Sequence, residues 1–316
     1  MISVNNLSKV YKVHQRRSNL LADIFFRKYK EIVALDKVSF SIGENELVGF
    51  IGPNGAGKTT TLKILSGVLY PSSGNVNIWG FYPFDKKPDF LKQIAFIMGQ
   101  RNQLVWDLPA IDTFKLNQAV YEVPENEFKK TVGELSELLD CRDLVYKPVK
   151  TLSMGERMKM ELIAALIHQP KIIFLDEPTI GLDIFSQEAV RNFIKRYQQE
   201  FKKTIILTSH YLEDVKRLAK RLIVIDKGKI LHDGNLKDIL AKFSNEKFVS
   251  IILEKEIDET ELSDIGQLVS YKFPKAVFKV KKNQLAEKIS VISKKIPFAD
   301  LNIEEERIEE VVKKMF

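Results

Sequence analysis

The stretch GPNGAGKTT, from Gly52 to Thr60, decides the fold of this chain. It matches the pattern G-x-x-x-x-G-K-[ST] completely, with an apolar run over 47–51 before it and a helix-like pattern after it. Small residues let the backbone close tightly, so that amide N–H groups and the start of the next helix face bound phosphates. Lys58 is expected to reach the β and γ phosphates, and Thr59 to bind Mg²⁺. The alternative is a glycine-rich turn that binds nothing.

The composition is that of a globular protein rather than a secreted or membrane-spanning one. Of 316 residues, 45% are hydrophobic and 29% charged, and the only cysteine, Cys141, cannot form an intramolecular disulfide. No signal peptide or membrane span is predicted, since the charge-free run over 64–84 contains prolines, asparagines and glycines. The net charge of +7 comes without a recognisable nucleic-acid motif, so no nucleic acid is expected as a partner.

Changes in residue pattern divide the chain into three regions. Residues 1–243 predict an α/β domain with a mixed sheet, and residues 101–168 within it predict a helical subdomain because they show no strand-like alternation. Residues 244–316 are lysine-rich and predict a small separate α/β domain, with strands over 248–254 and 276–280 and helices near 285–296 and 308–315. Its role stays open between regulation, dimer contacts and stabilisation of the fold.

Residues 1–11 predict an edge strand that ends at Tyr11, and residues 12–31 interrupt the β-rich region that resumes at Ile32. Within this insertion, apolar residues fall on one helical face among several arginines and lysines. Two interpretations stay open: a short amphipathic helix packed on its own domain, or a helix at an anionic membrane surface or a membrane partner.

A pair of carboxylates, Asp176 and Glu177, follows the continuous apolar run over 172–175, which is typical of a strand buried on both faces of a parallel sheet. The carboxyl end of such a strand lies beside the phosphate loop, so Asp176 is expected to hold Mg²⁺ directly or through water. Glu177 is then placed to orient the attacking water as general base. The alternative is an ordinary acidic turn at a strand end.

Ser153 and Glu156 form a capping box ahead of a helical pattern. This is a common helix start, but it stands shortly before the Asp176 strand, where the ATP-binding cassette (ABC) family carries its signature. With it, the chain resembles the nucleotide-binding subunit of an ABC transporter. The resembling motifs, in order, are Gly52–Thr60 (Walker A), Gln100 (Q-loop), Ser153–Glu156 (signature), Ile172–Glu177 (Walker B), Gly181–Asp183 (D-loop) and Thr208–His210 (H-loop). The implied fold is an α/β P-loop NTPase cassette with an antiparallel β subdomain.

The resemblance implies that two copies close head to tail, so that each ATP lies between the phosphate loop of one and the signature of the other. His210 then contacts the γ phosphate, Gln100 joins Mg²⁺ or the attacking water to the membrane partner, and Tyr11 stacks on adenine. The residues expected to bind ATP are Tyr11, Gly52, Pro53, Asn54, Gly55, Ala56, Gly57, Lys58, Thr59, Thr60, Ser153, Gly155, Glu156 and Asp183. Those expected at Mg²⁺ are Thr59, Gln100 and Asp176, and those expected in catalysis are Glu177, His210 and Gln100.

The signature departs from the family pattern at two positions. Glycine is usual where Met154 stands, and glutamine where Glu156 stands. Glu156 keeps the capping box but places a negative charge near a triphosphate, which is expected to weaken anion binding at that helix start. Arg157 beside it is a candidate to offset this charge.

Residues 99–109 and 177–183 resemble a bacterial exporter-type group whose permeases are separate chains, usually two different ones. This implies an ATPase that drives export from the cytoplasmic face of the membrane, as a peripheral subunit. Trp106 is interpreted either as part of the groove for the permease or as a core residue. Two alternatives remain: a soluble ABC ATPase that acts on ribosomes, DNA or cofactor assembly, and a nucleotide-binding regulator, which the retained Glu177 and His210 disfavour.

Overall fold

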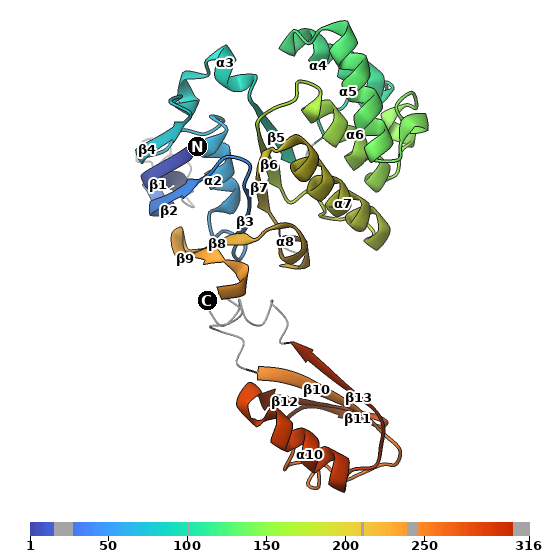
Figure 1. The fold of residues 1–316 in the computed structure, drawn as a ribbon. Coiled ribbons are helices and arrows are strands. Elements are labelled where there is room, and N and C mark those ends of the chain that lie inside the picture. Colours follow the sequence, from blue (N-terminus) through green and yellow to red (C-terminus); the bar gives the residue numbers. More distant parts are fainter. Residues whose placement is uncertain (16–27, 100–101, 210–211, 239–245, 306–316) are drawn as a thin grey trace. The chain divides into compact units, whose positions relative to one another are not determined.

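The structure is a computed structural model that describes residues 1–15, 28–99, 102–209, 212–238 and 246–305. The chain forms two compact units, Met1–Gly234 and Asn235–Phe316 (Figure 1). The predicted domain boundary after residue 243 stays a prediction, because residues 239–245 lie outside the described residues.

A six-stranded sheet, in the order β5-β6-β7-β3-β8-β9, is the centre of the first unit. Its strands are β3 (Leu47–Ile51), β5 (Ile94–Met98), β6 (Ile172–Asp176), β7 (Thr204–Thr208), β8 (Arg221–Asp226) and β9 (Lys229–Asn235). Strands β5, β6, β7, β3 and β8 pair in parallel, and every residue of β3, β6 and β7 is buried. Their carboxyl ends therefore meet at one edge, where ligands bind in such sheets.

An antiparallel sheet in the order β2-β1-β4 forms the second layer of this unit. Its strands are β1 (Ile2–Gln15), β2 (Lys28–Ile42) and β4 (Ser73–Ile78). The prediction of an edge strand ending at Tyr11 was wrong, because β1 lies between β2 and β4 and continues to Gln15. Gln15 pairs with Lys28, so both ends of the predicted insertion are strand, and the helix expected inside it lies outside the described residues.

Helix α2 (Lys58–Leu65) packs in a core to which both sheets contribute. Leu62 of α2 is fully buried there, together with Val38 of β2 and Phe50 of β3. The Phe40 and Phe50 rings meet edge to face with their centroids 5.6 Å apart, a geometry that aromatic pairs prefer. Packing on both sides of α2 fixes the phosphate loop that precedes it.

Further helices of this unit lie outside its central sheet (Figure 1). They are α3 (Pro88–Leu91), α4 (Ala110–Tyr121), α5 (Glu125–Leu138), α6 (Met154–Leu166), α7 (Ile184–Phe201) and α8 (Leu212–Leu218). Short 3₁₀ turns cover Pro83–Asp85, Arg142–Leu144 and Val149–Thr151. Helices α4, α5 and α6 group together in the region predicted to be helical (Figure 1). Among the described residues, none of these helices combines the length and the apolar character that a bilayer span requires.

The described residues of the second unit include a four-stranded antiparallel sheet and helix α10. The strands, in the order β11-β12-β10-β13, are β10 (Glu246–Leu253), β11 (Gln267–Lys272), β12 (Lys275–Lys281) and β13 (Phe298–Glu305), and the helix is α10 (Leu285–Lys295), preceded by a 3₁₀ turn at Lys282–Gln284. The sequence predicted the two central strands and the helix. It missed β11 and β13 because edge strands bury few side chains and carry many polar residues. The helix expected at 308–315 lies outside the described residues.

Candidate nucleotide-binding site

The phosphate loop, residues 52–57, joins the end of β3 to the start of α2. Gly57 directly precedes α2 and has a φ angle of 113°, which side-chain-bearing residues rarely adopt. A Cβ atom there would also lie 2.6 Å from the carbonyl oxygen of Ala34. Since glycine has no side chain to cap the helix, the first N–H groups of α2 stay available to an anion.

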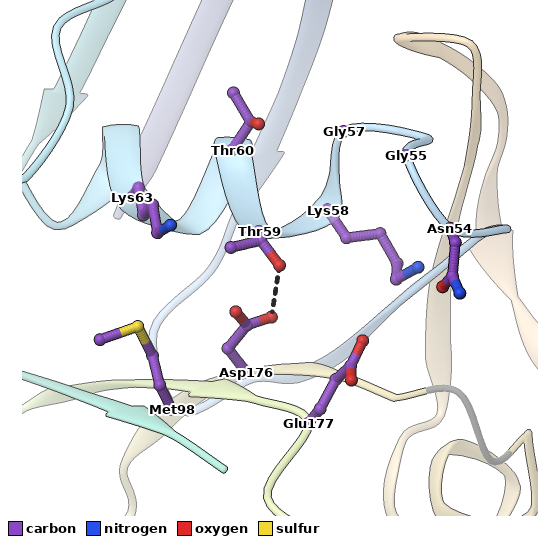
Figure 2. A pocket seen from close by; sticks show the side chains of 10 residues that line it. All are labelled: Asn54, Gly55, Gly57, Lys58, Thr59, Thr60, Lys63, Met98, Asp176 and Glu177. Carbon is purple, nitrogen blue, oxygen red and sulfur yellow. Dashed lines mark hydrogen bonds between the residues drawn. The ribbon is translucent and has the colours of Figure 1, made fainter. Parts of the chain in front are cut away.

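The loop forms one wall of a cavity of about 460 Å³. Its lining residues are Asn54, Gly55, Gly57, Lys58, Thr59, Thr60, Lys63, Met98, Asp176 and Glu177. Figure 2 shows Met98, Asp176 and Glu177 facing the loop and α2 from the opposite side. The ends of β5 and β6 thus supply the second wall, as parallel strands that meet at one edge predict.

Lys58 is buried, and loop carbonyls hold its ammonium group. Its Nζ donates to the backbone oxygens of Gly52 at 2.6 Å and Pro53 at 3.0 Å. Burial lowers the pKa of Lys58, while the nearby carboxylates of Glu177 and Asp176 oppose this shift. An anion in the cavity would favour the charged lysine, so this group is suited to bind phosphate.

Asp176 ends β6 and joins three elements through one carboxylate oxygen. Its Oδ1 accepts a hydrogen bond from Thr59 Oγ1 at 3.0 Å and from Thr208 Oγ1 at 2.6 Å. Thr59 begins α2 and Thr208 ends β7. The sequence motifs predicted that Asp176 and Thr59 would meet, but nothing in them indicated the contact with Thr208.

Glu177 leaves β6 with a positive φ angle of 56°. Its backbone N–H donates to the carbonyl oxygen of Thr208 at 3.0 Å and lies 3.2 Å from the Thr208 hydroxyl. This backbone turn directs the Glu177 side chain into the cavity, where Figure 2 shows it on the same side as Asp176. A carboxylate that faces the phosphate loop across the cavity has the chemistry of a general base.

The residues of the cavity fit Mg²⁺ that arrives with a nucleotide. In such sites Mg²⁺ takes one or two carboxylates, phosphate oxygens and water as ligands. Thr59 Oγ1 and Asp176 Oδ1 supply two oxygens 3.0 Å apart. Within the described part of the chain, no group of three or more His, Cys, Asp or Glu residues could hold a metal ion alone. Phosphate oxygens would therefore have to complete the ligand set.

The predicted signature residues lie outside this cavity. Ser153 caps α6: its hydroxyl accepts from the Glu156 N–H at 3.3 Å, and the Glu156 carboxylate accepts from the Ser153 N–H at 2.8 Å. The predicted capping box therefore exists. The hydrogen bond from the Ser153 backbone N–H to the Glu156 carboxylate lowers the pKa of Glu156. Arg157 lies over the ring of Trp106, 5.7 Å from its centroid. Trp106 is 48% exposed, so its interpretation as a core residue was wrong.

The start of α7 lies beside the start of α6. Asp183 caps α7 by accepting from the N–H groups of Phe185 and Ser186, both at 3.0 Å. A Cβ atom at Gly155 would lie 2.0 Å from the Ser186 hydroxyl oxygen, so only glycine lets the two helix starts approach this closely. The buried Gly155 and the exposed Asp183 therefore lie at two adjoining helix starts, and neither lines the phosphate cavity.

Three other predicted residues are not brought to the cavity by the described structure. Tyr11 lies in β1, half-buried, with the Lys9 ammonium 5.3 Å from its ring centroid. Gln100 and His210 lie outside the described residues. Their predicted roles stay predictions.

Sequence reasoning missed a buried carboxylate, Asp214, that contacts the segments after β6 and β7. Asp214 of α8 is 1% exposed and accepts from Arg191 Nε at 2.6 Å, Thr179 Oγ1 at 2.5 Å and Ser209 Oγ at 2.7 Å. Thr179 follows Glu177 by two residues, and Ser209 follows Thr208. Asp214 thus connects the loops after β6 and β7. The sequence around it shows only an ordinary amphipathic helix, which gives no signal of such a role.

Comparisons with known proteins agree with this arrangement. A family model described as ABC transporter matches residues 35–180. The ABC transporter ATP-binding protein NatA of Bacillus subtilis is 33% identical over 73% of this chain and 94% of its own length. The energy-coupling factor transporter ATP-binding protein EcfA2 of Caldanaerobacter subterraneus is 33% identical over 66% of this chain and 74% of its own length. The dimeric structure of MJ0796, a bacterial ABC transporter cassette, matches with a TM-score of 0.62 and 24% identity over 75% of this chain and 99% of that one.

These likenesses confirm the predicted fold class of an α/β P-loop cassette, and they cover the part of the chain that holds the cavity. The phosphate loop, the capped α6 and the acidic pair follow one another along the chain in the order that the family resemblance implied. The chain belongs to the ATP-binding proteins of the ABC transporter family, ATPases whose hydrolysis of ATP is coupled to transport.

Proposed function

We propose that two copies of this chain close head to tail on ATP and drive export through two separate transmembrane permease subunits. One observation carries the proposal: the cavity holds the phosphate loop with Asp176 and Glu177, whereas Ser153, Gly155 and Glu156 at the start of α6 do not line it. A single copy therefore presents two half-sites. Each becomes complete only when the α6 start of a second copy covers the phosphate cavity.

In the closed pair, each residue of the cavity has a separate task. Lys58 would exchange its bonds to the Gly52 and Pro53 carbonyls for bonds to phosphate oxygens. Mg²⁺, held by Thr59 and Asp176, would neutralise phosphate charge. Glu177 would accept a proton from the attacking water. Phosphoryl transfer depends mainly on positioning and charge stabilisation, so hydrolysis would wait for closure.

His210 and Gln100 are proposed to complete the catalytic group. His210 follows Ser209 in the sequence, and the Ser209 hydroxyl donates to Asp214 at 2.7 Å. Gln100 follows Gly99, whose N–H donates to the Asp176 carbonyl oxygen at 2.9 Å. In the sequence, Gln100 thus adjoins a residue bonded to Asp176 of the cavity, and His210 adjoins a residue bonded to the buried Asp214. We propose a γ-phosphate contact for His210 and a sensor role for Gln100.

A groove in the same unit is an argument for a membrane partner. It has a volume of about 530 Å³ and lies between α3, β5, α4 and α6, with Val68, Leu91, Val120 and Tyr121 among its lining residues. Val68 is 63% and Val120 64% exposed, so the groove offers apolar surface to a partner. We propose that a cytoplasmic helix of a permease docks there. Trp106 does not line this groove, although its neighbour Gln103 does.

The proposed direction and location follow from the exporter-type resemblance of residues 99–109 and 177–183. The subunit would sit peripherally on the cytoplasmic face of the membrane, without nucleic acid as a partner. The name of EcfA2 refers to an energy-coupling factor transporter, which makes import the competing direction. A soluble ATPase that acts on ribosomes, DNA or cofactor assembly is the alternative from a different class.

The test uses the tagged full chain, captured from detergent-solubilised membranes of its own cells. The proposal expects integral membrane proteins in stoichiometric amounts, and expects Val120→Glu to abolish their capture. Tyr146→Glu is the matched control, since Tyr146 is 72% exposed and does not line the groove. Ribosomes, or no stoichiometric partner, would contradict the proposal in favour of the soluble ATPase.

A further inference from the structure

Glu161 is a buried carboxylate that the proposed chemistry does not use. It lies in the middle of α6, is 3% exposed, and faces the chain that follows β5. Its two carboxylate oxygens accept from the Gln103 N–H at 2.9 and 3.1 Å, and Oε1 lies 3.4 Å from the Leu104 N. Two successive backbone N–H groups thus bind one carboxylate, in the manner of a small anion site.

The buried carboxylate of Glu161 indicates a structural role other than packing. Burial raises the pKa of Glu161, and the bonds from Gln103 and Leu104 and the charge of Arg157 oppose this shift. Among the residues that the structure describes, no cation lies within ion-pair distance of Glu161. An apolar side chain would fill this volume without desolvating a charge. A carboxylate, in contrast, makes stronger hydrogen bonds to the two N–H groups.

Gln103 extends this contact from α6 to the wall of the phosphate cavity. Its side-chain Nε2 donates to the carbonyl oxygen of Phe96 in β5 at 3.0 Å. Met98, two residues after Phe96, lines the cavity. Gln103 therefore binds α6 through its backbone and β5 through its side chain.

The residues after Leu104 are attached to the helices rather than to the sheet. The Val105 N–H donates to the Thr113 hydroxyl of α4 at 3.2 Å, and the Trp106 carbonyl oxygen accepts from the Lys150 N–H at 2.9 Å. Lys150 lies three residues before Ser153, the cap of α6. Segment 103–106 is thus hydrogen-bonded to the helical region at Val105 and Trp106. The Gln103 side chain binds it to β5 through the Phe96 carbonyl oxygen.

We infer that Glu161 is a positioning residue that sets the start of α6 relative to β5, and so aligns the half-site carried by α6. The inference rests on the proposed head-to-tail pair. Glu161 lies eight residues after Ser153, about 12 Å along the helix at 1.5 Å per residue. A shift of α6 at Glu161 would therefore displace the Ser153 end, while the phosphate loop of the same copy, held by α2 and β3, would stay in place.

The test compares variants of the full chain by three measurements: the Kd for a fluorescent ATP analogue in the isolated subunit, the kcat of ATP hydrolysis, and ATP-driven dimerisation in a Glu177→Gln background. For Glu161→Ala, we expect a Kd within twofold of the parent, a kcat at least tenfold lower and dimerisation at least tenfold weaker. Glu161→Gln, whose amide oxygen still accepts the Gln103 N–H, is expected to keep at least a third of the parent kcat.

Two further variants separate positioning from general stability. Met160→Ala removes an equally buried side chain from the same helix and is expected to lower Tm but to keep kcat within threefold. Gln103→Ala removes only the bond to Phe96 from an exposed side chain, so it tests the inference even if Glu161→Ala does not fold. We expect its kcat to fall at least threefold with an unchanged Kd.

An unchanged kcat in Gln103→Ala, or a loss in Glu161→Ala that Met160→Ala reproduces, would overturn the inference. Failure of the proposed function would give a different experimental result. In that case the Glu177→Gln chain with an intact Glu161 would not dimerise on ATP at all.

Discussion

The Thr59 hydroxyl donates to Asp176 Oδ1 over 3.0 Å, and this bond joins residues 117 positions apart in the sequence. It brings the first turn of α2 to the end of β6, at the point where we propose that Mg²⁺ binds together with the nucleotide. Thr59→Val keeps the shape of the side chain but removes the hydroxyl. We expect the affinity for ATP with Mg²⁺ to fall by roughly 10- to 100-fold, as for the loss of other groups around a bound metal.

The measurement is a titration with a fluorescent ATP analogue, with Mg²⁺ and with EDTA. The parent should bind more weakly in EDTA, whereas Thr59→Val should bind almost equally in both. Lys58→Ala serves as the comparison, since it should weaken binding in both conditions. A Mg²⁺ dependence of Thr59→Val as large as that of the parent would remove Thr59 from the metal site.

Glu177→Gln is expected to stop hydrolysis without preventing nucleotide binding. Glutamine has the same shape but cannot accept the proton of the attacking water, so kcat should fall at least 100-fold, within the range attributed to general bases. Phosphate release and static light scattering would show a slow ATPase that stays dimeric in ATP. The exposed Glu200→Gln on α7 is the control, and steady turnover in Glu177→Gln would show that another group acts as the base.

Asp214→Ala is expected to destabilise the first unit and to slow hydrolysis. The change leaves the Arg191 guanidinium without its contact at 2.6 Å, and breaking a buried ion pair costs about 3 kcal/mol or more. Urea unfolding measures this loss. Because Thr179 and Ser209 also lose their acceptor, kcat should fall more than tenfold while the Kd for ATP stays near that of the parent. Asp214→Asn, which keeps an acceptor oxygen, should show smaller losses; equal losses would argue against positioning through hydrogen bonds.

Glu156→Gln is expected to strengthen ATP-driven closure. The bond from the Ser153 N–H keeps the pKa of Glu156 low, so the side chain is charged at neutral pH near the proposed triphosphate. Removal of one charge at a helix start changes anion binding by about 0.5–1 kcal/mol, roughly two- to fivefold in affinity. Light scattering of Glu156→Gln in a Glu177→Gln background measures it. Unchanged or weaker dimerisation would count against this interpretation.

His168 predicts a loss of stability in acid. Burial lowers the pKa of His168 to about 4, against an ordinary value of 6.5, while its Nε2 lies 3.0 Å from the Ile94 carbonyl oxygen. Between pH 6.5 and pH 4 the unfolded chain therefore binds this proton and the folded chain does not, so stability falls as the pH falls. The free energy of unfolding lost through this proton uptake reaches about 3 kcal/mol near pH 4.

The measurement is urea unfolding of the parent and of His168→Gln from pH 7 to pH 4.5. The parent should lose more stability over this range than the variant, because glutamine does not titrate. Parallel curves would show that the imidazole does not stay neutral in the folded chain. The Tyr121 ring stacks on His168 at a centroid distance of 3.8 Å, so part of any constant offset between the curves reflects lost stacking.

The sequence predicted those parts of the site that depend on neighbouring residues. The phosphate loop is such a part, because its turn needs glycine at Gly57 whatever surrounds it. The capping box of Ser153 and Glu156 is another, since its two hydrogen bonds span only three residues. The acidic pair after a fully apolar run was predicted for the same reason: a strand buried on both faces ends at the ligand-binding edge of a parallel sheet.

The tertiary structure decided which polar residues are buried and what they bind. Nothing local distinguishes Glu161 or Asp214 from the exposed acidic residues of other helices, because burial depends on the segment that packs against the helix. In the same way, β1 became a central strand because β2 and β4 are both available to pair with it.

The sequence by itself determined the phosphate loop, the helix cap and the buried strand, since adjacent side chains encode such local structures, and its resemblance to the ABC family implied an ATPase of the cassette type. Only the tertiary structure placed Ser153, Gly155 and Asp183 away from the phosphate cavity and tied α6 to β5 through Glu161 and Gln103. Contacts between distant segments depend on packing in three dimensions, and no short stretch of residues specifies them.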